Sequence, residues 1–313
     1  MAYGDIPFVY GLMQNPPVAG LTGGVGGSFD PNALIESGIL EVQGEPLALT
    51  GRGVLVGFVD TGIRYELDVF RQSDGSTRIA AIWDQEADRI YMEEEINNAL
   101  QSESPRSIVP VTDELGHGTA MASVAAGSRV EGGRSYIGAA PDSRLLVVKL
   151  RQAPQNVREY YLVADNAVCY SETDIEQGLQ FLDEQAERLG LPLVICIGLG
   201  TNLASHTGTS TLERAINSIA VKIGRAVVIC SGNEGNKQHH FSGCFNRNVF
   251  QNEIGQLRRD GEIRVSEGVQ GITAQRMGNA ALSVPIFLEK PRRRDRARYS
   301  PEYGRNNNVS LYL

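Results

Sequence analysis

The sequence predicts an α/β protein built on a doubly wound parallel sheet flanked by helices. Two observations support this fold class. Short runs rich in Val, Ile and Leu recur along the chain, and each has the length of a strand buried on both faces. Segments with helical spacing separate these runs, and hydrophobic residues make up 42% of the 313 residues, which suffices for a packed core. The runs are VLVGFVD (54–60), LLVVKL (145–150), LPLVICIG (191–198) and AVVICSG (226–232).

The beginning of the chain lacks the pattern of a regular element. Residues 1–50 are rich in Gly and Pro, as in NPPVAGLTGGVGG, so we expect an irregular arm that leads into a short helix near 31–40. The core is expected to occupy 51–244. Within it, the segment 174–190 has apolar residues at helical spacing and charges on the opposite side. The buried face of this predicted helix carries Ile175, Leu179, Leu182 and Ala186.

The pattern changes after about residue 245. Short, more polar stretches without helical periodicity predict the opening of a separate β-rich unit over 245–313, which is too short to close a sheet by itself. Its segment 290–305 is basic and has no apolar pattern. We interpret that segment as a solvated tail in preference to a functional basic patch.

Composition limits the classes of partner. The formal net charge of −8 argues against a nucleic-acid partner, because affinity for phosphate backbones depends on clustered Lys and Arg. No apolar run approaches a membrane span, and the N-terminus lacks the regions of a secretory signal, so we expect a soluble protein. The four cysteines show no CxxC spacing, and Cys196 and Cys230 lie inside apolar runs. Buried free thiols and a reducing compartment are therefore expected.

Three polar residues stand where a strand ends or a helix begins. Asp60 closes the first apolar run, in VGFVDTG, where a carboxylate needs hydrogen bonds or a partner. His117 lies between two glycines ahead of a run of small residues, and Asn233 follows the fourth apolar run. Taken singly, each also fits a structural role: a cap or turn residue for Asp60, a structural histidine for His117 and a turn residue for Asn233. Because chemistry in such sheets gathers at the carboxyl ends of the strands, we expect the three to lie together.

The motifs around these residues, VDTG (59–62), GHGT (116–119) and SGNEG (231–235), resemble the peptidase core of the subtilisin-like serine proteases, the subtilases. The resemblance runs from about Gly51 to Gly243 and implies the subtilisin-like form of the α/β fold. It further implies an endopeptidase that hydrolyses peptide bonds with an Asp/His/Ser triad. In that mechanism Asp60 orients His117, His117 acts as general base and then general acid, and the Asn233 amide donates to the oxyanion.

The resemblance also implies a place for the substrate. The stretch ICIGLGTN (195–202) is similar to the segment that lines the family's substrate cleft. A peptide or protein substrate is therefore expected to pair with the enzyme by strand addition at Leu199 and Gly200, beside Thr201. No cofactor is expected. Many subtilases bind structural calcium through loop carboxylates and carbonyls, and the sequence points to no particular calcium site.

Four further stretches resemble one group within the subtilases. DIPFVYGLM, LTGRGVLVGFVDTGI, GTNLASHTGTSTLERAI and GNEGNKQHHFSG are similar to the clostridial Csp-type subtilases linked to spore germination. Those proteins carry a jelly-roll insert between the oxyanion Asn and the nucleophile, which the resemblance implies for the β-rich residues 245–313. It also implies a cytoplasmic or spore-associated location.

Ser210, in the triplet GTS, invites assignment as the nucleophile. The family's serine motif reads G-T-S-x-A/S-x-P and comes after the oxyanion Asn, whereas Ser210 precedes Asn233 and lacks the small residue and the Pro. Ser210 and Glu213 instead have the spacing of a capping box before an amphipathic run, so we predict a helix cap. No other serine carries the motif. We therefore expect the nucleophile beyond Leu313, in a longer gene of which this sequence is a truncated or frame-shifted part that also lacks the family's inhibitory propeptide.

Alternatives from other classes remain open. The first is a non-catalytic subtilase-like pseudoprotease that binds a partner or a signal. The second is a nucleotide enzyme, suggested by GLTGGVGG, but these glycines precede the first predicted strand and cannot place a helix N-terminus at a pyrophosphate. A metal cluster is a further alternative that no zinc spacing supports. Its residues are His206, His239, His240 and Cys244.

Overall fold

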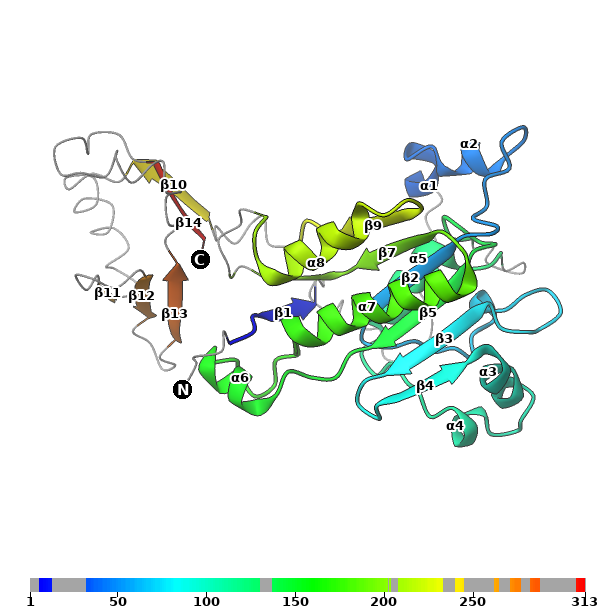
Figure 1. Cartoon of the computed structure of the whole chain (residues 1–313), viewed down its shortest axis with the longest axis horizontal. Helices are drawn as coiled ribbons and strands as arrows, with labels where there is room; N and C mark the ends of the chain where they lie inside the picture. Colours follow the sequence, from blue (N-terminus) through cyan, green and yellow to red (C-terminus); the bar gives the residue numbers. More distant parts are fainter. Residues whose placement is uncertain are drawn as a thin grey trace.

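The computed structural model describes residues 6–12, 32–129, 137–201, 203, 208–232, 240–244, 262–264, 271–276, 282–287 and 308–312. Its centre is a six-stranded sheet with the strand order β4-β3-β5-β2-β7-β9 (Figure 1). Neighbouring strands are parallel except β3 and β4, which pair antiparallel at one edge. The strands are β2 Leu55–Asp60, β3 Ile79–Asp84, β4 Arg89–Met92, β5 Arg144–Lys149, β7 Leu193–Ile197 and β9 Arg225–Ile229.

The four predicted apolar runs form the parallel strands β2, β5, β7 and β9, so the predicted fold class is confirmed. Strands β3 and β4 were not predicted. Because they pair antiparallel, the sheet is mixed at one edge instead of wholly parallel. Strand β3 has the same buried character as the predicted strands, since it lies between β5 and β4.

Helices cover both faces of the sheet. On one face α7 and α8 pack against the strands, and on the other α3 and α5 do so. Alternate residues of β2 show the division, because Leu55 and Val59 join the first hydrophobic cluster while Val56 and Phe58 join the second. The helices are α1 Asn32–Glu36, α2 Ile39–Gln43, α3 Glu93–Leu100, α4 Pro105–Ile108, α5 His117–Ala126, α6 Gln155–Tyr160, α7 Glu172–Leu189 and α8 Thr211–Ala220, with a 3-10 turn η1 at Asp68–Phe70.

Helix α7 confirms the helix predicted over 174–190. All four residues predicted to face the core, from Ile175 to Ala186, are fully buried. Its close contact with the sheet depends on Gly178, where an added Cβ would lie 3.1 Å from Cγ1 of Val59. A larger residue at this position would push the helix away from β2.

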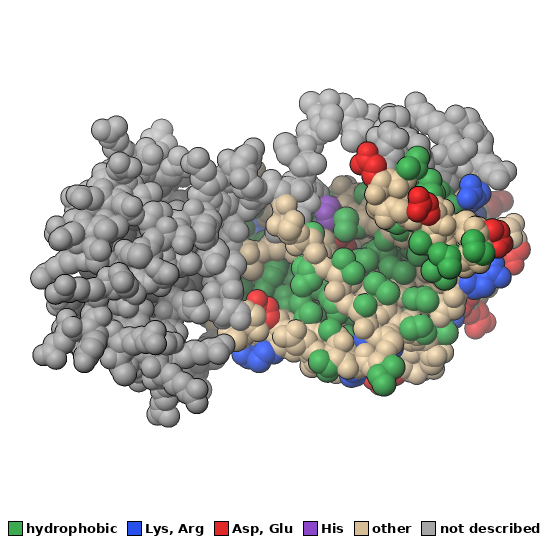
Figure 2. All heavy atoms as spheres, turned by 90° about the horizontal axis from the view of Figure 1, so that it is seen from above, with side chains coloured by type: hydrophobic (Ala, Val, Ile, Leu, Met, Phe, Trp, Pro, Cys, Tyr) green, Lys and Arg blue, Asp and Glu red, His purple; other side chains and the backbone are tan. Residues whose placement is uncertain are grey.

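Strand β9 was expected to be buried on both faces, and this expectation is wrong. Val228 and Ile229 are 55% and 54% exposed, because within the described part of the chain β9 pairs only with β7. Figure 2, which views the molecule from the side of β9 in Figure 1, shows hydrophobic side chains gathered on this face. Cys230, directly after β9, is likewise exposed, although we expected a buried thiol.

The expectation of an irregular N-terminal arm is wrong over its first part. Val9–Leu12 forms strand β1, which pairs antiparallel with β6 (Cys169–Ser171) and with β8 (Leu199–Gly200). Its partners lie far along the sequence, so no local signal revealed the pairing. The single helix expected near 31–40 is divided into α1 and α2 at Gly38, whose φ of 72° ends a regular helix.

Among the described residues near the carboxyl end, five short strands pair antiparallel, in one sheet of β10 and β14 and another of β11, β12 and β13. The expected tail over 290–305 lies outside the described residues. The division into 1–50, 51–244 and 245–313 stays a prediction. The strands are β10 His240–Cys244, β11 Glu262–Arg264, β12 Gly271–Arg276, β13 Leu282–Phe287 and β14 Asn308–Tyr312.

The predicted capping box at the start of α8 is confirmed. The Glu213 amide donates to Oγ of Ser210 over 3.2 Å, and the Ser210 amide donates to Oε2 of Glu213 over 2.7 Å. Ser210→Ala removes one of these bonds, so we expect the free energy of unfolding to fall by about 0.5–2 kcal/mol. Urea denaturation measures this loss. Ser218→Ala, an exposed site inside α8, is the control, and equal stability of the two variants would contradict the cap.

Candidate active site

The site begins at the carboxyl end of the central strand β2. Asp60 is the last residue of β2, and its side chain is almost completely buried. Oδ1 of Asp60 accepts a hydrogen bond from the Thr61 amide over 2.7 Å and lies 2.7 Å from Nδ1 of His117. His117 is the first residue of α5, and its side chain is only 9% exposed. The sequence-predicted pair is therefore in hydrogen-bonding contact.

The contact has a defined chemical consequence. A neutral imidazole that donates from Nδ1 to a carboxylate carries its lone pair on Nε2. In this tautomer Nε2 is the ring nitrogen of His117 that can take up a proton, and the buried Asp60 carboxylate would stabilise the resulting imidazolium. A distance of 2.7 Å is typical of a charge-assisted hydrogen bond.

The carboxylate of Asp113 holds the first turn of α5, and thereby His117, in place. Oδ1 of Asp113 accepts from the Gly116 amide over 2.8 Å, and Oδ2 accepts from the Thr119 amide over 2.8 Å. The Thr119 hydroxyl donates to the same Oδ2 over 2.6 Å. A negative charge on amides at a helix N-terminus is favourable, so Asp113 fixes where α5 begins.

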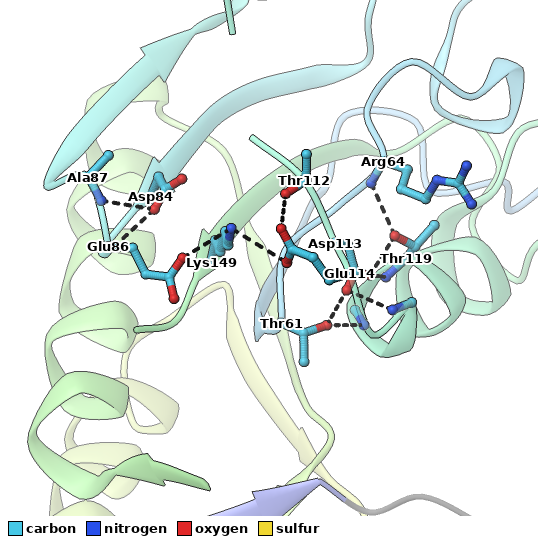
Figure 3. Close-up of polar contacts among 12 residues, drawn as sticks. Thr61, Arg64, Asp84, Glu86, Ala87, Thr112, Asp113, Glu114, Thr119 and Lys149 are labelled. Atoms are coloured by element: carbon cyan, nitrogen blue, oxygen red, sulfur yellow. Dashed lines mark hydrogen bonds and ion pairs between the residues drawn. The ribbon is translucent and has the colours of Figure 1, made fainter. Parts of the chain in front are cut away.

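Thr61 joins this cap to the strand that carries Asp60. Its hydroxyl donates to Oδ1 of Asp113 over 2.7 Å and accepts from the Gly118 amide over 2.9 Å (Figure 3). The residue after Asp60 is thus bound to the residue after His117. Sequence reasoning missed the roles of Thr61 and Asp113. The available signal was an acidic residue a few positions before a predicted helix start, together with the hydroxyl of the DTG triplet.

Glycines allow the elements around the pair to approach. A Cβ on Gly118 would lie 2.3 Å from the carbonyl oxygen of Gly62, a distance that no real side chain tolerates. A Cβ on Gly198 would lie 3.0 Å from Cε1 of His117 and 3.2 Å from Oδ2 of Asp60. Gly198 therefore brings the backbone that follows β7 directly against the imidazole ring.

A buried lysine joins two loops at the same edge of the sheet. Lys149, the last residue of β5, has a side chain only 8% exposed, and Nζ lies 3.2 Å from Oε2 of Glu86 and 3.8 Å from Oε2 of Glu114 (Figure 3). The pKa of Glu114 is lowered, first because the Thr112 hydroxyl donates to it and also because of the Lys149 charge. The loop after β3 and the loop before α5 are thereby held together.

The carboxylates at this edge of the sheet act electrostatically on the phenol of Tyr170, in β6. Burial raises the pKa of its phenol, and the carboxylates of Asp60, Asp113 and Glu86 raise it further. Tyr170 therefore stays protonated and neutral near neutral pH.

The residues expected to bind substrate follow Gly198 directly. Leu199 and Gly200 form β8, and Leu199 is buried while Gly200 and Thr201 are half-buried. Because a Cβ on Gly198 would lie against the His117 ring, β8 begins one residue after a position next to the imidazole. Both residues of β8 are paired with β1.

The oxyanion residue and the metal-cluster residues predicted from the sequence are not among the described side chains. Asn233, His206, His239 and the side chains of His240 and Cys244 lie outside the part of the chain that the structure describes. Among the described residues, no three His, Cys, Asp or Glu side chains are grouped as metal ligands. None of the described helices combines the length and the apolarity of a membrane span. Cys169, Cys196 and Cys230 are free thiols, and burial raises the pKa of Cys196 to about 11.

Comparison with known proteins supports the fold class. A model of the subtilase family matches residues 51–252, which is more than half of the chain. The solved structure of the Clostridium perfringens CspB protease matches with a TM-score of 0.63 and 26% sequence identity, over 90% of this chain and 61% of that one. This chain thus spans less than two thirds of the CspB protease. The Csp-type resemblance predicted from the sequence is confirmed.

Two other solved structures match more weakly. An S41 psychrophilic protease has a TM-score of 0.39 at 20% identity, over 63% of this chain and 52% of that one. MycP1, solved without its N-terminal propeptide, has a TM-score of 0.36 at 20% identity, over 70% of this chain and 53% of that one. Because the family pattern extends over residues 51–252, which include the whole central sheet with Asp60 and His117, this chain belongs to the subtilase family.

Proposed function

We propose that this chain supplies the Asp and His of a serine-type endopeptidase. The observation that carries the proposal is the 2.7 Å contact between Nδ1 of His117 and the buried Asp60 carboxylate at the carboxyl edge of a subtilase sheet. This contact sets the tautomer that a general base requires. A protein that only binds a partner has no catalytic need for this contact.

The proposed reaction is the hydrolysis of a peptide bond. Nε2 of His117 takes the proton of a serine hydroxyl as the oxygen attacks the carbonyl carbon, and Asp60 stabilises the resulting imidazolium. His117 then gives that proton to the leaving amine, and a water molecule repeats the sequence to release the acyl group. We assign the oxyanion hole to the side-chain amide of Asn233, as the family resemblance implies. Loss of such a donor lowers turnover by about 10²–10³.

The nucleophile is assigned to a serine that carries the motif G-T-S-x-A/S-x-P, which this sequence does not contain. Ser210 is excluded because its hydroxyl caps α8. A peptide or protein is the proposed substrate, and Leu199, Gly200 and Thr201 are the proposed residues that bind it. The missing motif also keeps a pseudoprotease as the second candidate function.

Fluorophosphonate labelling separates these two functions. In native protein isolated with any sequence that extends beyond this chain, we expect labelling of one serine and its loss in His117→Ala. Asp60→Asn is expected to slow turnover by about 10⁴, because the imidazole then loses the carboxylate that fixes its tautomer. Mass spectrometry identifies the labelled residue. Ser210→Ala is the control and should label normally, whereas labelling that survives His117→Ala would contradict the triad.

Thr61 offers a test of how His117 is positioned. Thr61→Val keeps the side-chain volume but leaves the Gly118 amide and Oδ1 of Asp113 without their shared hydroxyl partner. We expect the free energy of unfolding to fall by about 1–3 kcal/mol and kcat to fall more than KM rises. Thr61→Ser retains the hydroxyl and should restore both quantities. Equal kcat in the Val and Ser variants would show that this hydroxyl does not position His117.

A further inference from the structure

Helix α5 carries His117 at its first residue, and its other end is held by hydrogen bonds to distant segments. The last turn of a helix leaves carbonyl groups without partners inside the helix. In α5 the carbonyl of Val124 accepts from the Ala139 amide over 3.0 Å, and that of Ala125 accepts from the Ala140 amide over 2.8 Å. The carboxyl end of α5 is thereby docked onto the residues ahead of β5.

The carbonyl of Ala126, the last residue of α5, accepts from the guanidinium of Arg78. The same guanidinium donates to the Val69 carbonyl over 2.9 Å and to the Ser143 carbonyl over 2.6 Å. Val69 belongs to η1, and Ser143 directly precedes β5, which pairs with the strand that ends at Asp60. One side chain therefore joins the end of α5 to two other segments.

Arg78 is a buried charge. Only 6% of the residue is exposed, and among the described residues it forms no ion pair and its buried Nε has no hydrogen-bond partner. Burial lowers the pKa of Arg78 to about 10, although the charge of Asp142 acts in the opposite direction. The negative end of the α5 dipole favours a cation at this place. An apolar side chain of similar size would fill the space without the cost of desolvation, so the bonds of Arg78 call for a further reason.

The remainder of α5 has few side chains that could fix its tilt. The apolar residues that it buries against the sheet are the small Ala122 and Ala126. Large side chains interlock with the grooves of a neighbouring element, whereas small ones leave a smooth contact surface. The orientation of α5 therefore depends on the bonds at its two ends. Asp113 and Thr61 supply those at the first turn, and Arg78 supplies part of those at the last.

The length of α5 converts a tilt into a displacement of His117. The 10 residues of α5 span about 15 Å, so a tilt of about 4° moves one end by about 1 Å. A misplacement of about 1 Å in a catalytic site can lower the rate by about 10². A side chain at the far end of α5 can thus change the reactivity of the imidazole without touching it.

We propose that Arg78 is a positioning residue for His117 and that it acts by fixing the carboxyl end of α5. The expected effect on turnover rests on the proposed function, whereas the effect on the position of the imidazole does not. All the hydrogen bonds of Arg78 described above go to backbone carbonyls. Its loss should therefore lower kcat and leave KM nearly unchanged.

The test measures how fast the Nδ1 proton of His117 exchanges with water, by NMR of the ¹⁵N-labelled chain. This proton lies in the hydrogen bond to Asp60, so its exchange reports on the 2.7 Å contact. Arg78→Met removes the guanidinium and keeps an unbranched side chain. We expect exchange to become about tenfold faster or more, because the contact opens more often.

Arg158→Met is the matched control. Arg158 is 8% exposed and also donates to three backbone carbonyls, but these lie in the loop 164–167 instead of α5. Urea denaturation should show a similar loss of stability in the two Met variants, while Arg158→Met changes the exchange of the His117 proton by less than about threefold. Equal acceleration in both variants would show that Arg78 has a merely structural role and would overturn the inference.

Arg78→Lys is a milder variant that decides the question if Arg78→Met does not fold. It keeps the positive charge but loses the planar fork that reaches several carbonyls at once. We expect exchange to be faster than in the unaltered chain and slower than in Arg78→Met. A Lys variant that reverses the acceleration seen in Arg78→Met would also support the inference, since the charge would then suffice. Exchange at the unaltered rate in both variants, or in Arg78→Lys alone if the other does not fold, would overturn it.

Labelling by a fluorophosphonate separates this inference from the proposed function. In native protein isolated with any sequence that extends beyond this chain, Arg78→Met should react about tenfold more slowly or more, with half-saturation at a similar reagent concentration. No labelling of the unaltered native protein would refute the peptidase and leave the exchange result standing. Labelling that depends on His117, with unchanged proton exchange in the Arg78 variants, would refute the positioning role alone.

Discussion

The hydrogen bond between the buried Asp60 carboxylate and His117 is the constraint on which the rest of the site depends. A carboxylate at the carboxyl end of a fully buried strand is costly unless donors surround it. The Thr61 amide and the His117 ring supply those donors. This contact holds the His117 ring in one position and one orientation. His117 is the first residue of α5, so the start of that helix sets where the ring lies.

That requirement explains the polar groups and glycines around the pair. Asp113 and Thr61 fix the first turn of α5 by hydrogen bonds, and the absence of a side chain at Gly118 lets α5 approach the loop after β2. Lys149 secures the neighbouring loops through Glu86 and Glu114. Thr61, Asp113 and Gly118 thus act on the position of His117, whereas Lys149 acts on the loops beside it.

Strand β1 joins segments that lie far apart in the sequence. It pairs with β6 on one side and with β8 on the other, and both pairings are antiparallel. The carboxylate of Glu172 accepts from the Phe8 amide ahead of β1, and Tyr10 is buried in the hydrophobic cluster under α7. The N-terminal segment therefore helps to hold the backbone that follows Gly198 beside His117.

The sequence by itself determined the parallel strands, the amphipathic face of α7, the cap at Ser210 and the identity of Asp60 and His117, because each has a local signature: an apolar run, a helical spacing or a motif next to a strand end. Only the tertiary structure decided that β1 fills the slot between β6 and β8, that β9 is an exposed edge, and that Asp113 and Thr61 hold His117. These features join segments far apart in the chain, from Val9 to Gly200, and their cause is the pairing of distant backbone and the burial of distant charges. No local pattern encodes the pairing of distant backbone, and the local signal for Asp113 and Thr61 does not say which distant group each one contacts.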